Sequence, residues 1–217
     1  MFLGHFALGF AAKKVDTGVS LATAFVAAQL ADVVWPVLVL SGVERVAIAP
    51  GDTAVTPLRF ESFPYSHSLV ALALWGAAFG ALHYLSRGRA RAAILLALLV
   101  LSHWVLDALS HRPDVPLAPW SETVVGLGLW RSRPATLAVE GLLFAGGVAL
   151  YVAATRGRDG AGRWGLAALL GVLGAAYLAA FFGPPPPSVS AVALTSMLGA
   201  VVLMAWAAWV DRHRSPR

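Results

Sequence analysis

Histidine and carboxylate side chains occur inside runs of sequence that are otherwise hydrophobic. Charged groups at the centre of a bilayer cost about 3 kcal/mol each on insertion scales, so several retained together indicate a function. Imidazole and carboxylate groups are ligands for metal ions such as zinc. The sequence therefore predicts a metal site inside a membrane. The candidate residues are His5, Asp32, His67, His103, Asp107 and Glu140.

The composition is that of an integral membrane protein. Hydrophobic residues make up 59% of the 217 residues, charged residues only 12%, and the mean hydropathy is +0.74, which excludes an ordinary soluble domain. The chain has no cysteine, so a divalent metal would be bound by imidazole and carboxylate. That donor set suits zinc, our first expectation, or manganese, as one or two ions.

Six apolar runs are long enough to cross a membrane, since a helix needs about 20 residues to span roughly 30 Å of hydrocarbon. The run Met1–Ala12 is too short to span and predicts a half-helix. We therefore predict an all-α polytopic membrane bundle of six transmembrane helices plus this half-helix, in a single domain of residues 1–217. Residues 1–155 would carry the metal-site helices and 156–217 a C-terminal helix pair. The predicted spans are Val19–Leu40, Ser66–Ser86, Ala90–Ser110, Pro134–Thr155, Arg163–Phe182 and Val189–Val210.

Clusters of Lys and Arg fall on one side of the membrane if the six helices alternate in direction. The positive-inside rule makes that side cytoplasmic and places both termini there. Because the basic residues lie mostly in short loops, they indicate topology and not a nucleic-acid partner. The clusters lie at 13–14, 87–91, 156–163 and 212–217.

Helix rise places the candidate residues at similar depths. Asp32 lies thirteen residues beyond Val19, and His103 lies thirteen beyond Ala90, which puts both roughly 20 Å above the cytoplasmic edge. Glu140 reaches about the same height from the opposite edge. We therefore expect the groups to converge in the outer half of the bilayer.

The sharpest local pattern is a histidine and an aspartate one helical turn apart. His103, Asp107 and His111 follow one another at intervals of four residues, a spacing that places side chains on one helix face. They can therefore face one ion. The alternative is a buried His–Asp hydrogen bond that only tightens helix packing, but the further ligand-type residues at this depth favour a metal.

The other candidates also have alternatives. Asp32 could bind a metal or share a proton. His67 could merely begin a helix, with Ser66 as its N-cap. His5 could be an interfacial residue of an N-terminal anchor. Glu140 could be a metal ligand, a general base or a hydrogen-bonded packing residue, and its role is left open.

Several of these motifs, taken together, resemble a known family. They are His5 with Gly9, Asp32, Ser66-His67-Ser68-Leu69 and His103-Trp104-Val105-Leu106-Asp107. They resemble the YdjM-type membrane-bound metal-dependent hydrolases, a bacterial inner-membrane family, over roughly residues 1–140. That family is similar, in the order of its ligands, to zinc-dependent phospholipase C and the P1-type nucleases, which cleave phosphodiesters.

The resemblance implies a ligand set, with Asp107 able to bridge two ions and with second-site ligands beyond it. Two motifs depart from the family pattern. A doubled Pro-Asp-x-Asp is reduced to a single aspartate, and Phe63-Pro64-Tyr65-Ser66 stands where Arg-Gly-x-Thr is usual. The implied ligands are His5, Asp32, His67, His103 and Asp107, followed by His111 and Glu140 at the second site.

The expected chemistry is hydrolysis of a phosphoester or lipid-linked substrate. A bound divalent ion lowers the pKa of water toward about 7, and Asp32 or Glu140 could take the proton. Arginines near the outer mouth could hold an anionic headgroup or simply anchor the protein among headgroups. The loop from His111 to Trp130 is rich in Pro, Gly and Trp and could form a rigid lid. The arginines are Arg59, Arg112, Arg131 and Arg133.

Two other functions remain open at this point. A cation or proton transporter also buries His and Asp, but it needs a polar route to both faces. A noncatalytic scaffold could use a metal only to clamp helices together. Small residues permit close helix packing within a chain or in a homo-oligomer; the candidates are Gly146, Gly147, Gly171 and Gly174.

Overall fold

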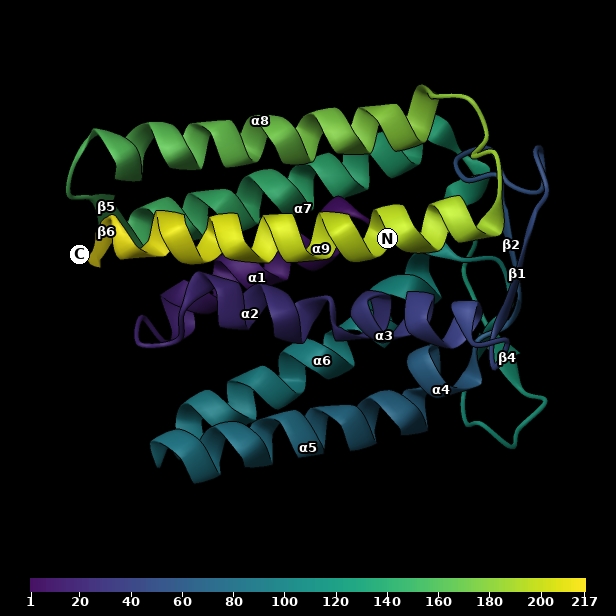
Figure 1. Cartoon of the computed structure of the whole chain (residues 1–217), viewed down its shortest axis with the longest axis horizontal. Helices are drawn as coiled ribbons and strands as arrows, with labels where there is room; N and C mark the ends of the chain where they lie inside the picture. The colour runs from purple at the N-terminus through teal and green to yellow at the C-terminus, as the bar shows by residue number, and fades with distance from the viewer.

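The computed structural model describes all residues 1–217 as a bundle of α-helices with three two-stranded sheets at its ends (Figure 1). The all-α prediction is confirmed. The α-helices are α1 Leu3–Val15, α2 Leu21–Ala28, α3 Leu30–Leu40, α4 Pro64–His67, α5 Leu69–Arg87, α6 Ala90–Ser110, α7 Arg133–Ala154, α8 Gly160–Phe182 and α9 Val189–Arg212. The short elements are β1 Arg45–Ile48, β2 Leu58–Ser62, β3 Val115–Pro116, β4 Val124–Val125, β5 Thr155–Gly157, β6 Arg214–Pro216 and the 3₁₀ turn η1 Leu129–Arg131.

Five helices, α5 to α9, are long and apolar enough to cross a membrane. Their ends differ from the predicted spans by no more than three residues, and α6 coincides with its prediction. The sixth span, predicted as one helix over Val19–Leu40, is instead the pair α2 and α3, bent by 53° at Gln29. The helix is interrupted where Gln29 leaves the helical conformation, with φ −106° and ψ 10°, whereas Pro36 lies further along the chain, inside α3.

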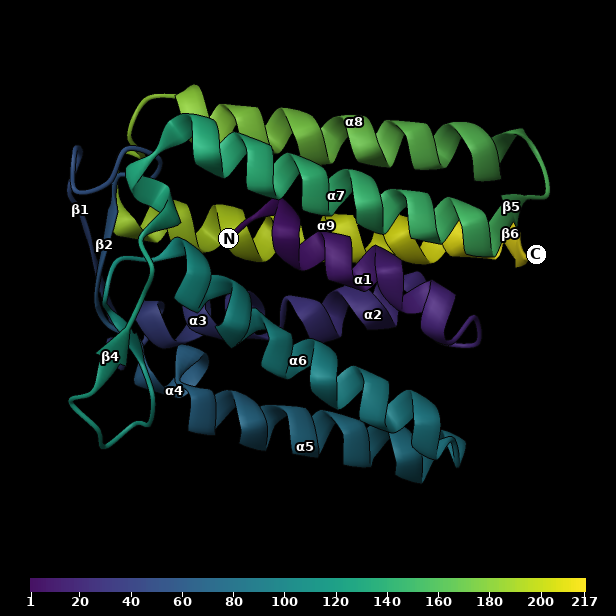
Figure 2. The ribbon, with the colours of Figure 1, turned by 180° about the vertical axis from the view of Figure 1, so that it is seen from behind.

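The half-helix α1 lies in the middle of the bundle, between α7 and α6, and packs against α7 (Figure 2). The two helices approach closely because Gly147 of α7 faces α1: a Cβ there would lie 2.2 Å from the carbonyl oxygen of Ala7. The other three glycines singled out for packing have open space beside them. Aromatic rings of Phe6, Phe10 and Phe25 pack edge to face around α1 and are almost fully buried.

The two ends of the bundle differ in composition. At one end, which we call the hairpin end, the β1–β2 hairpin and the β3–β4 pair lie beside the start of α7 (Figure 1). At the other, the basic end, α1, α5, α7 and α9 end and α6 and α8 begin, which gathers all four basic clusters together (Figures 1 and 2). This arrangement agrees with the predicted alternation of the helices.

Candidate metal centre

The carboxylate of Asp107 is the meeting point of four imidazoles. Its Oδ2 lies 3.2 Å from His103 Nε2 and 3.7 Å from His67 Nε2. Its Oδ1 lies 3.2 Å from His5 Nε2 and 3.9 Å from His111 Nε2. The terminal ammonium of Met1 also donates to Oδ1, at 2.5 Å, and forms an ion pair with it. The structure thus brings residues from α1, α4 and α6 to one point, as the sequence predicted.

Asp32 completes the convergence from α3. Its Oδ1 lies 3.5 Å from His67 Nε2, and its Oδ2 lies 3.8 Å from His103 Nε2. Because the bend at Gln29 starts a new helix, Asp32 sits in the first turn of α3, where the helix dipole favours a negative charge. Two groups have ligand atoms mutually within 4.8 Å: His5, His103 and Asp107, and Asp32, His67 and His103.

Three of the four imidazoles have a hydrogen-bond partner at Nδ1, and each of the three turns its Nε2 atom toward the centre. His67 Nδ1 lies 2.6 Å from Ser66 Oγ, His103 Nδ1 2.9 Å from the carbonyl oxygen of Ala28, and His111 Nδ1 3.0 Å from Asp114 Oδ1. Their Nε2 atoms therefore face the two carboxylates. Histidines that bind metals are held in this way, because the second ring nitrogen donates its proton to an acceptor and so fixes tautomer and orientation.

The carbonyl of Ala28 is available to His103 because of the helix break. Ala28 is the last residue of α2, so its oxygen lies where the regular hydrogen-bond ladder is interrupted. Backbone that is not helical is tolerated at membrane depth where protein buries it, and Ala28 is 1% exposed. The bend therefore places Asp32 in the first turn of a helix and also leaves a carbonyl oxygen free to bond His103.

Glu44 is a supporting residue that the sequence analysis missed. It is only 1% exposed, and it accepts hydrogen bonds from the backbone nitrogens of Tyr65 and Ser66 and from Ser66 Oγ, the last at 2.6 Å. Ser66 in turn meets His67 Nδ1, so a chain of hydrogen bonds runs from Glu44 to the centre. The suggested role of Ser66 as an N-cap is wrong: Ser68 caps α5 by accepting from Ala71 N, and Ser66 lies within α4.

Glu140 lies beside the centre but binds backbone. Its Oε2 accepts hydrogen bonds from the nitrogens of Phe2, Leu3 and Gly4, at 2.9, 2.7 and 3.3 Å. These are free N–H groups at the start of α1, where a carboxylate is also favoured by the helix dipole. The contact fixes the helix that carries His5, so the geometry favours an anchoring role over proton transfer.

Three of the four arginines near the hairpin end are paired with other protein groups. Arg112 pairs with Asp52 at 2.8 Å and with Asp114 at 2.9 Å. Arg59 pairs with Asp52, and Arg133 donates to the carbonyl oxygen of Ala54. The side chain of Arg131 lies against Gly128. None of the four lines the pocket above the centre, so their role in holding a headgroup stays a prediction.

A pocket of about 180 Å³ opens above the centre at the hairpin end. Its polar residues include Asp32, His67, Asp107 and His111, and aromatic and aliphatic side chains make up most of its walls. Asp32 is the exposed carboxylate of the set: its side chain is 44% accessible, against 3% for Asp107. Only Asp32 thus offers a carboxylate with ready access to water.

The loop expected to form a lid packs against the centre. Trp130 lies on the ring of His111, with centroids 4.2 Å apart, and it lines the pocket. Gly128 N donates to the carbonyl oxygen of His111, and a Cβ on Gly126 would lie 2.0 Å from the carbonyl oxygen of Arg112. Burial lowers the pKa of His111 despite the neighbouring carboxylates.

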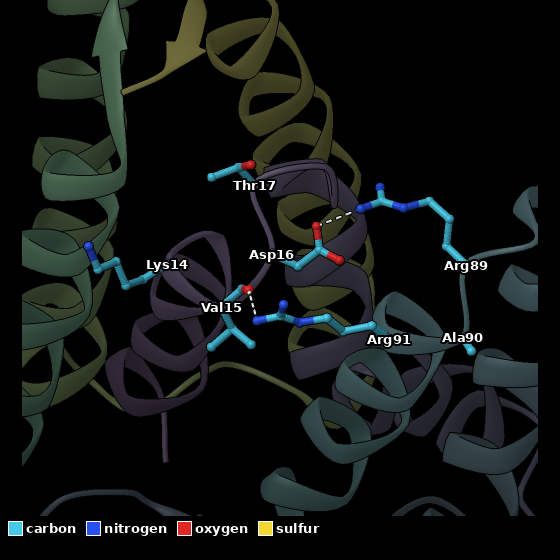
Figure 3. A pocket seen from close by; sticks show the side chains of 7 residues that line it. All are labelled: Lys14, Val15, Asp16, Thr17, Arg89, Ala90 and Arg91. Carbon is cyan, nitrogen blue, oxygen red and sulfur yellow. Dashed lines mark hydrogen bonds and ion pairs between the residues drawn. The ribbon is translucent and has the colours of Figure 1, made fainter.

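A larger pocket of about 430 Å³ lies at the basic end, between the end of α1 and the start of α6 (Figure 3). Two of its arginines are already paired: Arg89 with Asp16 at 2.7 Å, and Arg91 with the carbonyl oxygen of Val15 at 2.8 Å. These contacts tie α1 to the α5–α6 connection. They leave Lys14 as the remaining cation of this pocket.

The chemistry of the donor set fits a divalent cation. Imidazole and carboxylate are ligands for zinc and manganese, and two buried imidazole nitrogens, His5 Nδ1 and His103 Nε2, have no hydrogen-bond partner in the protein. Because both three-residue groups share His103, whose single facing nitrogen can bind only one ion, they describe overlapping positions around one centre. Comparisons with family models, with curated proteins and with solved structures find no match to this chain.

Proposed function

We propose that this chain is an integral membrane metal-dependent hydrolase that acts on a phosphoester or lipid-linked substrate. One observation carries the proposal: three imidazoles are held at Nδ1 and turn Nε2 toward two carboxylates on the floor of a pocket. Such an arrangement has the outer support that metal ligands require. The residues that resemble YdjM-type hydrolases are the ones that meet there, which supports the same reaction class.

In this proposal, His67, His103, Asp107 and Asp32 hold the cation, with His5 and His111 at its edge. When bound, zinc or manganese supplies Lewis acidity and makes a water molecule acidic enough to react near neutral pH. Asp32 would accept the proton of the attacking water, because its carboxylate is the one open to the pocket. The water oxygen would bond to phosphorus as the bond from phosphorus to the leaving ester oxygen breaks, and Asp32 would pass the proton to that oxygen.

We place the chain in a bacterial cytoplasmic membrane with the basic end and both termini in the cytoplasm. The apolar helices support a membrane location, and the gathering of the basic clusters at one end supports the orientation. The metal centre then lies in the outer half of the bilayer. Its pocket opens toward the outer surface.

Transport of a cation is less well supported than hydrolysis. A transporter needs a polar path from the centre to the basic end, but the rings of Phe6, Phe10 and Phe25 fill that part of the bundle. A scaffold with a structural metal would close its coordination shell, since structural sites lack an open position. Asp32, which remains open to the pocket, argues for a catalytic site.

Elemental analysis and a hydrolysis assay test the proposal together. Purified wild type should contain zinc or manganese and, after chelation and reloading, should hydrolyse bis(p-nitrophenyl) phosphate. His103→Ala should lose both properties, whereas Leu98→Ala, an exposed position on the same helix, should retain both. Wild type without a transition metal would contradict the proposal. Metal-dependent cation uptake into vesicles without hydrolysis would support a transporter instead.

A further inference from the structure

The wall of the pocket that α8 forms is largely apolar, whereas the floor carries the His and Asp side chains. Tyr177, Ala180 and Phe181 line this wall, and Val55 and Leu58 of the β1–β2 hairpin also line the pocket. Ala180 is exposed, and the next residue along α8 beyond Phe181, Phe182, is 60% exposed. An apolar surface therefore continues from the metal centre to the outside of a spanning helix.

Tyr177 carries the most informative atom of this wall. The residue is 5% exposed, yet its hydroxyl has no hydrogen-bond partner in the protein. Buried polar groups are nearly always bonded, because leaving one unpaired costs about 1–3 kcal/mol. Phe2, whose nitrogen is held by Glu140, stacks on the Tyr177 ring at 6.2 Å and fixes its position. The hydroxyl is thus held beside the pocket without a protein group to bind.

The size of the pocket limits what it can hold. At about 180 Å³, it is smaller than the roughly 300–1,000 Å³ of sites that enclose a whole small-molecule ligand. It has room for a polar group and the first few carbons of a chain. The remainder of a longer substrate must stay outside, where the neighbouring surface of α8 is apolar.

From these observations, and resting on the proposed hydrolase function, we infer that the substrate is a membrane amphiphile with a long apolar chain. Its polar head lies over the His and Asp floor and accepts a hydrogen bond from the Tyr177 hydroxyl. Its chain leaves past Ala180 and Phe181 and remains in the lipid along α8. The substrate therefore enters sideways from the membrane. Tyr177 belongs to a helix that lies outside the family resemblance.

A matched pair of phosphodiesters tests the inference in the full chain, loaded with zinc in detergent micelles. The two probes are methyl p-nitrophenyl phosphate and hexadecyl p-nitrophenyl phosphate, which share the reacting group and differ only in the chain. Wild type should show a kcat/KM at least about tenfold higher for the hexadecyl ester, because chain carbons are buried against α8. Tyr177→Phe should lower kcat/KM about tenfold for both esters at unchanged zinc content, since it removes only the shared hydrogen bond.

Two further variants distinguish an effect at the pocket wall from a general effect of a large side chain on α8. Ala180→Trp fills the exit and should reduce hydrolysis of the hexadecyl ester by a much larger factor than hydrolysis of the methyl ester. Leu178→Trp places the same side chain at an adjacent, half-exposed position that does not line the pocket, and it should leave both rates unchanged. Equal kcat/KM for the two esters in wild type, or no effect of Tyr177→Phe, would overturn the inference.

A binding measurement distinguishes failure of the inference from failure of the proposed hydrolysis. Hexadecylphosphonic acid, which has no ester bond to cleave, should bind wild type more tightly than methylphosphonic acid does, and Ala180→Trp should weaken that binding. If neither ester is hydrolysed but the binding pattern holds, the hydrolase proposal fails and the amphiphile pocket stands. If the esters are hydrolysed but chain length has no effect on binding or rate, only the pocket assignment fails.

Discussion

Two clusters of buried charge lie at opposite ends of this bundle, and their hydrogen bonding differs. At the basic end, Lys13 Nζ donates to the carbonyl oxygens of Thr17 and Val19 and pairs with Asp211. Asp211 also accepts from Leu21 N and from the Tyr151 hydroxyl. All three ammonium protons and both carboxylate oxygens therefore have partners. This cluster is complete within the protein.

The cluster at the hairpin end is not complete within the protein. His5 Nδ1 and His103 Nε2 lack hydrogen-bond partners, and the contacts between the Nε2 atoms and the two carboxylates range from 3.2 to 3.9 Å. The outer Nδ1 atoms of His67, His103 and His111 have partners, whereas that of His5 does not. The cluster at the basic end is thus closed on itself, whereas the cluster at the hairpin end leaves ring nitrogens unpaired, which is the arrangement expected if it holds a ligand.

Replacing the central carboxylate should have the largest effect. Asp107→Asn keeps the side-chain shape but removes the charge that four imidazoles face, so bound metal and hydrolysis should both fall by more than about a hundredfold. Elemental analysis and the bis(p-nitrophenyl) phosphate assay measure this. Chelation should lower the thermal unfolding midpoint of wild type and leave that of Asp107→Asn unchanged. An equal shift in both proteins would show that no metal is bound at this centre.

Breaking the complete cluster should affect stability and not metal binding. Lys13→Met removes the ammonium but leaves the Asp211 carboxylate buried, which costs about 3–5 kcal/mol when one partner of a buried pair is lost. Denaturant unfolding in micelles should show this loss, while the zinc dissociation constant of the folded protein should not change. A large change in metal affinity would mean that the two ends are coupled, and the contrast between them would not hold.

Two serines that flank His67 provide the sharpest test of the outer support. Ser66→Ala cuts the hydrogen-bond chain from Glu44 to His67 Nδ1 and should weaken metal binding about 10–100-fold. Ser68→Ala removes the N-cap of α5 and should cost about 1 kcal/mol of stability with little effect on metal affinity. Equal metal affinities in the two variants would show that Glu44 and Ser66 do not support metal binding by His67.

The sequence predicted the features of this site that depend on local pattern. Apolar runs located the spans, and the i, i+4 spacing of His103 and Asp107 located the face of α6 that meets the other candidate residues. The groups behind the imidazoles could not be found in this way. Ala28 contributes a backbone carbonyl, and Glu44 lies in a charged loop where a buried side chain is not expected. Both roles depend on chain segments that meet only in three dimensions.

Two structural features had no signal in the sequence. The span Val19–Leu40 is predicted as one continuous helix, whereas the structure breaks it at Gln29, well before Pro36, the residue that would be expected to bend it. Tyr177 is the second such feature, because an aromatic residue in a spanning helix is expected to face lipid or core, and only its unpaired hydroxyl distinguishes it.

The smallest expected effect comes from an exposed pair at the basic end, where Asp159 Oδ2 lies 2.7 Å from His213 Nδ1. The hydrogen bond from His213, followed by that from the backbone of Gly162, lowers the pKa of Asp159 below its ordinary value. A lowered pKa means that the folded state prefers the carboxylate, so its contribution to stability is present above the ordinary value and is lost as pH falls through the folded pKa. Thermal unfolding followed between about pH 6 and about pH 3 should show a slightly steeper loss for wild type than for Asp159→Asn, which keeps an acceptor for Gly162 N but cannot titrate. Identical slopes would show that this exposed pair is screened by solvent and contributes nothing measurable, which would leave the Lys13–Asp211 and Arg89–Asp16 pairs to stabilise this end.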